Sequence, residues 1–232
     1  MRVRLAWLFT VAALTAPSHA ADVPASASAS MTPLSLTVIG RNTFMLRDPL
    51  TLTFRDGAPS ITVPAGFVTE LGSIPKNLRW WDGKTDPSMA PAVLHDFLYW
   101  YQPCSQDEAD AVMYHAMGAL GATHPKASSA FQAVNNAGST AFKKNGERRR
   151  SGEVRTFTAA YSEVVVQSPN FDVSETLESA LRKAQSGAGL VQREFASPAV
   201  KLTCARLLYQ CKACVDHVTR KKTPKTRVAK GT

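Results

Sequence analysis

Charged residues make up only 19% and aromatic residues only 8% of the 232 residues in this sequence. No internal repeat is present, and no apolar segment is long enough to cross a bilayer. Apolar residues nevertheless account for 44% of the chain, which is enough to build a core. The composition therefore excludes collagen-like, coiled-coil and wholly disordered proteins, and the length predicts one globular domain with an appendage.

Acidic residues are also scarce: 18 of them face 27 basic residues, which gives a formal net charge of +9. The excess lies at the two ends of the chain, in Arg2 and Arg4 and in the lysines and arginines after Asp216. Because the region between these ends is almost neutral, we expect no specific binding of nucleic acid. Residues 217–232 are expected to form a basic disordered tail, with weak contact to an anionic membrane surface as the alternative.

The N-terminus has the order of a secretory signal over residues 1–20. A short basic stretch precedes twelve mostly apolar residues, Leu5 to Ala16, and the small residues Ser18 and Ala20 follow. No cysteine stands just after this point, which argues against a lipid anchor. Residues 21–33, rich in alanine and serine, are expected to be a flexible lead-in. The protein is therefore predicted to be periplasmic or secreted.

Export makes disulfide bonds the expected state of the four cysteines. Cys204, Cys211 and Cys214 fall in one predicted helix, where Cys204 and Cys211 would lie about 10 Å apart along the axis, too far to bond. If all four cysteines pair, the remaining connectivity joins Cys104 to Cys204 and Cys211 to Cys214. We expect these cysteines to be structural.

A main α+β domain is predicted for residues 34–145, with a small antiparallel sheet followed by a helical hairpin and further helices. Alternating apolar and polar residues predict short strands between positions 34 and 69. Helical patterns follow at 90–101, at 105–120 with Ser105 as the cap, and at 125–143. Residues 146–152 are expected to be a linker that opens a helical C-terminal extension over 146–216, with strand-like residues at 163–167 and helices near 174–185 and 198–220.

An ionisable pair, His95-Asp96, stands among apolar residues in the first helix of the hairpin. His95 and Asp110 lie at similar distances from the turn at Pro103, so an antiparallel helical pair brings them to the same height. Tyr99 is one turn from His95 and shares its face. A carboxylate that holds an imidazole is the arrangement of a general base with its orienting partner.

The segments Gly66-Phe67-Val68-Thr69-Glu70-Leu71-Gly72-Ser73-Ile74-Pro75, His95-Asp96-Phe97-Leu98-Tyr99 and Ala109-Asp110 resemble the motifs of the domain-of-unknown-function family 1353 of bacteria and phages. The likeness covers about Leu34 to Phe142. Glu70 stands where the family usually has an aspartate, and Gly72 where it has an alanine. The family has no established activity, so the resemblance implies a domain type and not a reaction.

The spacing His95-Asp96-x-x-Tyr99, with Asp110 on the next helix, is also similar to that of secreted calcium-dependent phospholipases. This resemblance implies that His95 is the base, Asp110 its orienting partner and Tyr99 a support. It further implies calcium as a cofactor, with Asp96 as a ligand and Glu70 as a substitute oxygen donor. The expected function is then the hydrolysis of an ester, with phospholipid as one substrate.

Two alternatives stand beside the hydrolase. In the first, the protein is a non-catalytic binding or structural protein, and the same residues form a stabilising polar network. In the second, it is a peptidoglycan-acting hydrolase that works on cell-wall material. Ser73 is expected to cap a helix, the pair Trp80 and Trp81 to pack in the core or form a binding lip, and His115 and His124 to lie on the surface.

Overall fold

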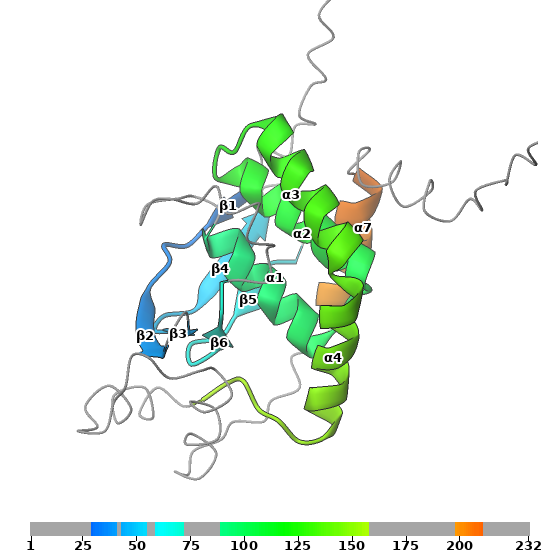
Figure 1. Ribbon diagram of the computed structural model, residues 1–232. Helices are drawn as coiled ribbons and strands as arrows, with labels where there is room; N and C mark the ends of the chain where they lie inside the picture. Colours follow the sequence, from blue (N-terminus) through cyan, green and yellow to red (C-terminus); the bar gives the residue numbers. More distant parts are fainter. Residues whose placement is uncertain (1–28, 41–42, 55–58, 72–88, 158–197, 211–232) are drawn as a thin grey trace, which may run out of the picture.

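The structure is a computed structural model that describes residues 29–40, 43–54, 59–71, 89–157 and 198–210. Within these ranges, short strands gather on one side and the helices pack on the other (Figure 1). The predicted α+β class is confirmed. Several predictions lie outside the described residues: the signal sequence, Ser73, the Trp80–Trp81 pair, the elements between 158 and 197, the Cys211–Cys214 pair and the basic tail.

The strands form two antiparallel three-stranded sheets, with the orders β1-β4-β5 and β2-β3-β6. Their bounds are β1 Ala29–Met31, β2 Leu36–Gly40, β3 Thr43–Leu46, β4 Leu50–Phe54, β5 Ile61–Val63 and β6 Val68–Thr69. In β4 and β5 the predicted alternation is confirmed, because Leu50, Leu52, Ile61 and Val63 are fully buried. Successive side chains of a strand point to opposite faces, so these four residues face the core on one side of the sheet.

Strand β1 lies inside the segment predicted to be a flexible lead-in. Ala29 pairs with Phe54 of β4, and Met31 pairs with Leu52. Ala29 is buried in the main core, which gives this short strand an apolar contact as well as ladder hydrogen bonds. The prediction for residues 21–33 is therefore wrong for Ala29–Met31.

The helices are α1 Met89–Tyr101, α2 Gln106–Ala119, α3 His124–Ala137, α4 Ser139–Arg150 and α7 Pro198–Gln210. The predicted hairpin of α1 and α2 is confirmed. At the start of α2, Ser105 and Glu108 form a capping box, in which the Ser105 amide donates to the Glu108 carboxylate and the Glu108 amide donates to the Ser105 hydroxyl. This cap fixes where α2 begins and therefore the height at which Asp110 faces α1.

The helix predicted over 125–143 is divided at Gly138, where α3 ends and α4 begins. A side chain at position 138 would collide with the Tyr99 hydroxyl and with the Val134 carbonyl. Helix α4 then continues to Arg150, so the linker predicted from residue 146 is mostly helical, and the boundary placed at 145 falls inside α4.

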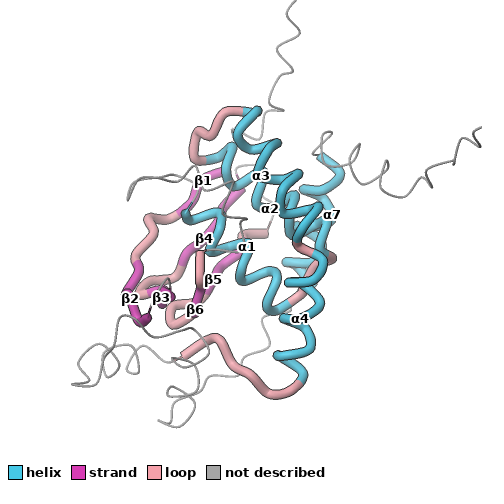
Figure 2. Tube along the Cα trace, in the orientation of Figure 1, coloured by secondary structure: helices cyan, strands magenta, loops and turns pink. Residues whose placement is uncertain are grey.

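After α4 the chain returns to the strands. The Val68 amide donates to the Arg155 carbonyl at 2.8 Å, and the Phe157 amide donates to the Gly66 carbonyl at 3.0 Å. Figure 2 shows this loop leaving α4 and running toward β6. Gly66 has φ +82°, and any side chain there would collide with the Phe157 carbonyl. A glycine is therefore required for this close approach.

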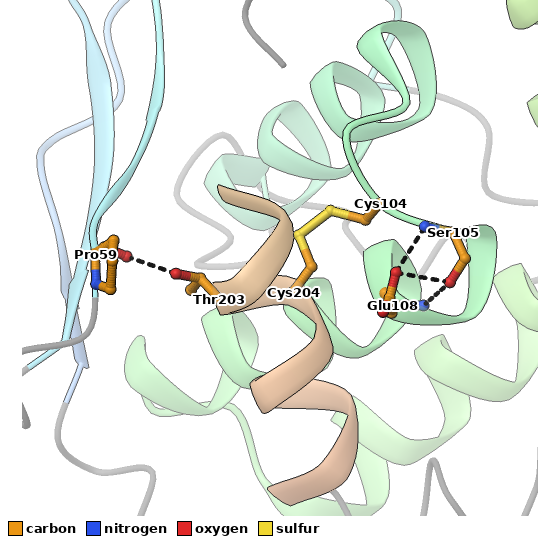
Figure 3. The surroundings of a disulfide bond; sticks show 6 residues. All are labelled: Pro59, Cys104, Ser105, Glu108, Thr203 and Cys204. Atoms are coloured by element: carbon orange, nitrogen blue, oxygen red, sulfur yellow. Dashed lines mark hydrogen bonds between the residues drawn. A yellow bond between two sulfur atoms is a disulfide. The ribbon is translucent and has the colours of Figure 1, made fainter. Parts of the chain in front are cut away.

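Helix α7 packs on α2 and is tied to the α1–α2 link by the Cys104–Cys204 disulfide (Figure 3). The predicted pairing of these two cysteines is confirmed. His115 of α2 lies under α7, with Nε2 at 2.9 Å from the Leu207 carbonyl oxygen. It is buried, so its predicted surface position is wrong, whereas His124 is half-buried.

Candidate functional site

Helix α1 lies between the strands and the other helices, and every residue from Ala90 to Tyr101 is buried. Its polar side chains must therefore find partners inside the protein, since a buried polar group without a hydrogen bond is costly. His95 and Asp96 are adjacent, so they leave the helix about 100° apart. His95 contacts α2, and Asp96 contacts Thr69 at the end of β6.

His95 and Asp110 meet across α1 and α2 as predicted. His95 Nε2 lies 2.8 Å from Asp110 Oδ1, and the Tyr99 hydroxyl donates to the same oxygen at 2.6 Å. The rings of His95 and Tyr99 pack one turn apart, with centroids 4.0 Å apart. Because Asp110 accepts both bonds, we assign the imidazole proton to Nε2, which leaves the lone pair on Nδ1.

Asn135 of α3 completes this cluster, and the sequence analysis missed it. Its Nδ2 donates to Asp110 Oδ2 at 3.0 Å and to Asp107 Oδ1 at 2.8 Å. Asn135 is fully buried and lies one turn after Phe131, on the buried face of α3. An amide on the apolar stripe of a helix is the signal that could have identified it. Below, "the Asp110 cluster" means His95, Tyr99, Asp110 and Asn135.

The electrostatics of the cluster keep Tyr99 a neutral donor. Burial, followed by the charge of Asp110 and the hydrogen bond to it, raises the pKa of the Tyr99 hydroxyl far above its ordinary value. The Asp110 carboxylate consequently receives hydrogen bonds from three side chains, which fix both of its oxygens. A carboxylate fixed in this way holds the imidazole in one tautomer and one orientation.

The Asp110 cluster is closed to solvent over most of its surface. Asp110 is 0% exposed, Tyr99 1% and His95 2%. The cluster can orient an imidazole, and it can also stabilise the packing of α1, α2 and α3 against one another. Both uses follow from the same contacts.

Of the predicted calcium ligands, Asp96 points from a neighbouring face of α1 toward β6, and Glu70 directly follows β6. Asp96 Oδ2 accepts the Thr69 hydroxyl at 2.5 Å, and the Thr69 oxygen in turn accepts the Leu71 amide at 3.1 Å. Asp96 is buried and Glu70 is exposed. Within the described ranges, no group of three or more His, Cys, Asp or Glu side chains is placed to hold a metal ion.

A cation of the protein itself, Arg155, lies beside these carboxylates, and the sequence analysis did not single it out. Its guanidinium carbon is 4.4 Å from the centroid of the Trp100 ring, and Trp100 follows Asp96 by one helical turn. Burial lowers the pKa of Arg155, while the negative charges of Glu70 and Asp96 act in the opposite direction. A guanidinium in this position repels a divalent cation, so the residues present do not fit the expected calcium site.

Comparison with known proteins defines the domain type. Residues 44–134 match the model of a family described as "Protein of unknown function (DUF1353)". This segment is therefore similar to that family, which confirms the resemblance based on the sequence motifs. No curated protein and no solved structure matches the chain.

The matched segment runs from β3 through α2 and into α3, and it contains Asp96, Glu70 and three members of the Asp110 cluster, whereas Asn135 lies one residue past its end. Arg155 and Cys204 lie beyond it. In the portion of the chain that is described, no helix is both long enough and apolar enough to cross a membrane.

Proposed function

We propose that the protein is an exported ester hydrolase in which His95 is the general base and Asp110 orients it. The observation that carries this proposal is the 2.8 Å contact between His95 Nε2 and Asp110 Oδ1, supported by Tyr99 and Asn135. These contacts leave Nδ1 of His95 as the nitrogen with a free lone pair. Phospholipid is one ester that fits the proposal.

In the proposed reaction, Nδ1 of His95 takes a proton from a water molecule while the water oxygen bonds to the ester carbonyl carbon. The tetrahedral intermediate then releases the alcohol oxygen, which takes up the proton from His95. The products are a carboxylic acid and an alcohol, and His95 returns to its neutral state. Asp110 stabilises the imidazolium that forms between the two steps.

Export to the periplasm or beyond is supported by the Cys104–Cys204 bond. Disulfide bonds between cysteines far apart in the chain form and persist mainly in oxidising compartments. The basic, apolar and small-residue order of the first twenty residues agrees with this location.

The test is turnover of a panel of phospholipids and simple esters by the purified protein, with calcium and with a chelator. We expect turnover in both conditions, and a decrease of at least about 100-fold in the His95→Gln variant. His124→Gln is the matched control, because His124 is half-buried and lies outside the Asp110 cluster. A wild-type protein that turns over none of the esters, or a His95→Gln variant as active as wild type, rejects the proposal.

A second candidate function is favoured by the burial of the Asp110 cluster. In that case the cluster is a polar network that fixes α1, α2 and α3 in a non-catalytic binding or structural protein. The two candidates differ in what His95→Gln changes. The hydrolase loses turnover, whereas the structural protein loses only stability, which is measured by urea unfolding of the same samples.

A further inference from the structure

The charge balance near Asp96 differs from that of a metal site. Asp96 is 8% exposed, and one of its carboxylate oxygens accepts a hydrogen bond from the Thr69 hydroxyl. A buried carboxylate with one neutral hydrogen-bond donor still needs a positive charge nearby, because burial of an uncompensated charge is costly. The phospholipase resemblance assigns this positive charge to calcium.

The fold places a guanidinium on the same side of α1. The backbone of Arg155 pairs with Val68, the residue before Thr69, and this pairing brings its side chain toward α1. The guanidinium carbon lies 4.4 Å from the centre of the Trp100 ring. Since Trp100 and Asp96 are one helical turn apart on α1, the stacked guanidinium lies on the face of the helix that carries Asp96.

Arg155 also forms a long ion pair with Glu153, but Glu153 is shared with a second arginine. Glu153 is held by Arg148, whose Nε donates to its Oε2 at 2.6 Å. The Nε of Arg155 is farther from Glu153, at 3.6 Å from Oε1. Arg155 is only 4% exposed, so its charge acts over short distances with little screening by water.

We infer that Arg155 is the built-in cation of this site, which neutralises Asp96 and Glu70 in the place that the resemblance gives to a divalent metal. The site is then independent of calcium. This inference does not depend on ester hydrolysis, because the charge balance is the same if the Asp110 cluster is purely structural.

A calcium ion and the Arg155 guanidinium cannot occupy this site together, because their coordination chemistry and charge are incompatible. Calcium is bound by about six to eight oxygen ligands and favours several carboxylates. A fixed guanidinium offers no oxygen, and its charge opposes that of the ion. Removal of the guanidinium takes away the positive charge that opposes a metal ion, while the Asp96 carboxylate, the Glu70 carboxylate and the Thr69 hydroxyl remain as oxygen donors.

The test is calorimetric titration of the full-length protein with calcium chloride. We expect no saturable binding to wild type up to millimolar calcium. Arg155→Met is expected to show saturable binding, at least tenfold tighter than any weak binding by wild type. The double variant Arg155→Met/Asp96→Asn should lose this binding. Arg155→Lys, which keeps the charge, is expected to behave as wild type.

Saturable binding by wild type that is lost in Asp96→Asn overturns the inference, and so does a folded Arg155→Met variant that binds no calcium. If Arg155→Met does not fold, the double variant Arg155→Met/Asp96→Asn is compared with it by thermal melting. Removal of both charges should recover a folded protein, and failure to do so contradicts the pairing. None of these measurements uses hydrolysis, so they are decided separately from the proposed function.

Discussion

Asp110 accepts hydrogen bonds from three side chains, two on α1 and one on α3, while it is completely buried. Each donor satisfies a different lone pair, and the carboxylate therefore holds α1 and α3 to α2 at one height. Whichever function the protein has, this carboxylate is the residue on which the arrangement of the Asp110 cluster depends.

Asp110→Asn is expected to lower the free energy of unfolding by about 3 kcal/mol, because the amide forces a donor against groups that already donate. The matched control is Asp107→Asn. Asp107 is half-buried and receives a single hydrogen bond from Asn135, so its loss is expected to be below about 1 kcal/mol. Urea unfolding of the two variants measures the difference. Equal stability of Asp110→Asn and wild type would show that the three bonds do not stabilise the fold.

The contact of His95 with Asp110 could be predicted from the sequence because both residues are close to the same turn and its geometry is local. Asn135 could not be found in the same way, since it reaches Asp110 across a sequence separation of 25 residues. Arg155 was missed for a similar reason: its position depends on backbone pairing with β6, for which residues 146–157 carry no recognisable strand pattern.

At the level of elements, two glycines mark important positions. Gly138 lies between α3 and α4, and Gly66 lies where the segment after α4 packs against the loop before β6. The pattern over 125–143 predicts one continuous helix, whereas the structure divides it at Gly138, where an added side chain would collide with Tyr99 of α1. The helical pattern of residues 125–143 cannot predict that the Tyr99 hydroxyl of α1 packs against this position. The strand at Ala29–Met31 has the same explanation, because its pairing with β4 is a tertiary contact.

Gly66→Ala is expected to destabilise the protein by about 3 kcal/mol or more, because the residue has a positive φ and the new methyl group collides with the Phe157 carbonyl. Gly121→Ala separates these two causes. Gly121 has φ +84° with nothing within 4 Å of an added side chain, so only the backbone cost of about 1–2 kcal/mol applies. Urea unfolding of both variants should therefore differ clearly, and equal losses would mean that Phe157 does not lie against Gly66.

The contact between α2 and α7 is expected to weaken in acid. Burial lowers the pKa of His115 below its ordinary value of 6.5, an effect only partly offset by the hydrogen bond to Leu207. The unfolded chain therefore binds a proton more readily than the folded one, so stability is full above about pH 6.5 and falls as the pH drops below it. His115→Gln keeps a donor for the Leu207 carbonyl without a titrating ring. Unfolding midpoints between pH 7.5 and pH 5 should fall less steeply in this variant, and parallel curves would contradict the assignment.

On the scale of the whole molecule, a disulfide bond links α7 to a part of the domain that is distant in sequence. Cys104 and Cys204 are separated by 100 residues in sequence, and Cys204 is fully buried. Thr203 also donates to the Pro59 carbonyl, so α7 contacts both the helical hairpin and the strand side. The order of elements in the domain could be predicted from the sequence, but the face of α2 that α7 covers could not, since no local pattern specifies it.

Replacement of both cysteines, Cys104→Ser/Cys204→Ser, is expected to lower the free energy of unfolding by about 2–5 kcal/mol, because a cross-link that closes a long loop restricts the unfolded chain. Urea unfolding measures the loss. Hydrogen exchange of α7 amides should also become faster in this variant, because one of the restraints that hold α7 on α2 has been removed. An unchanged unfolding midpoint would mean that the bond contributes little to the fold.

The return of Arg155–Phe157 to the motif at Gly66–Thr69 also bears on how the protein can be produced. A recombinant fragment that ends at residue 134, the limit of the family match, would leave the Val68 amide and the Gly66 carbonyl without their backbone hydrogen-bond partners. They would then form an exposed strand edge. Exposed strand edges pair with strands of other copies, so such a fragment should aggregate during purification. Expression trials should therefore retain the chain at least through Phe157.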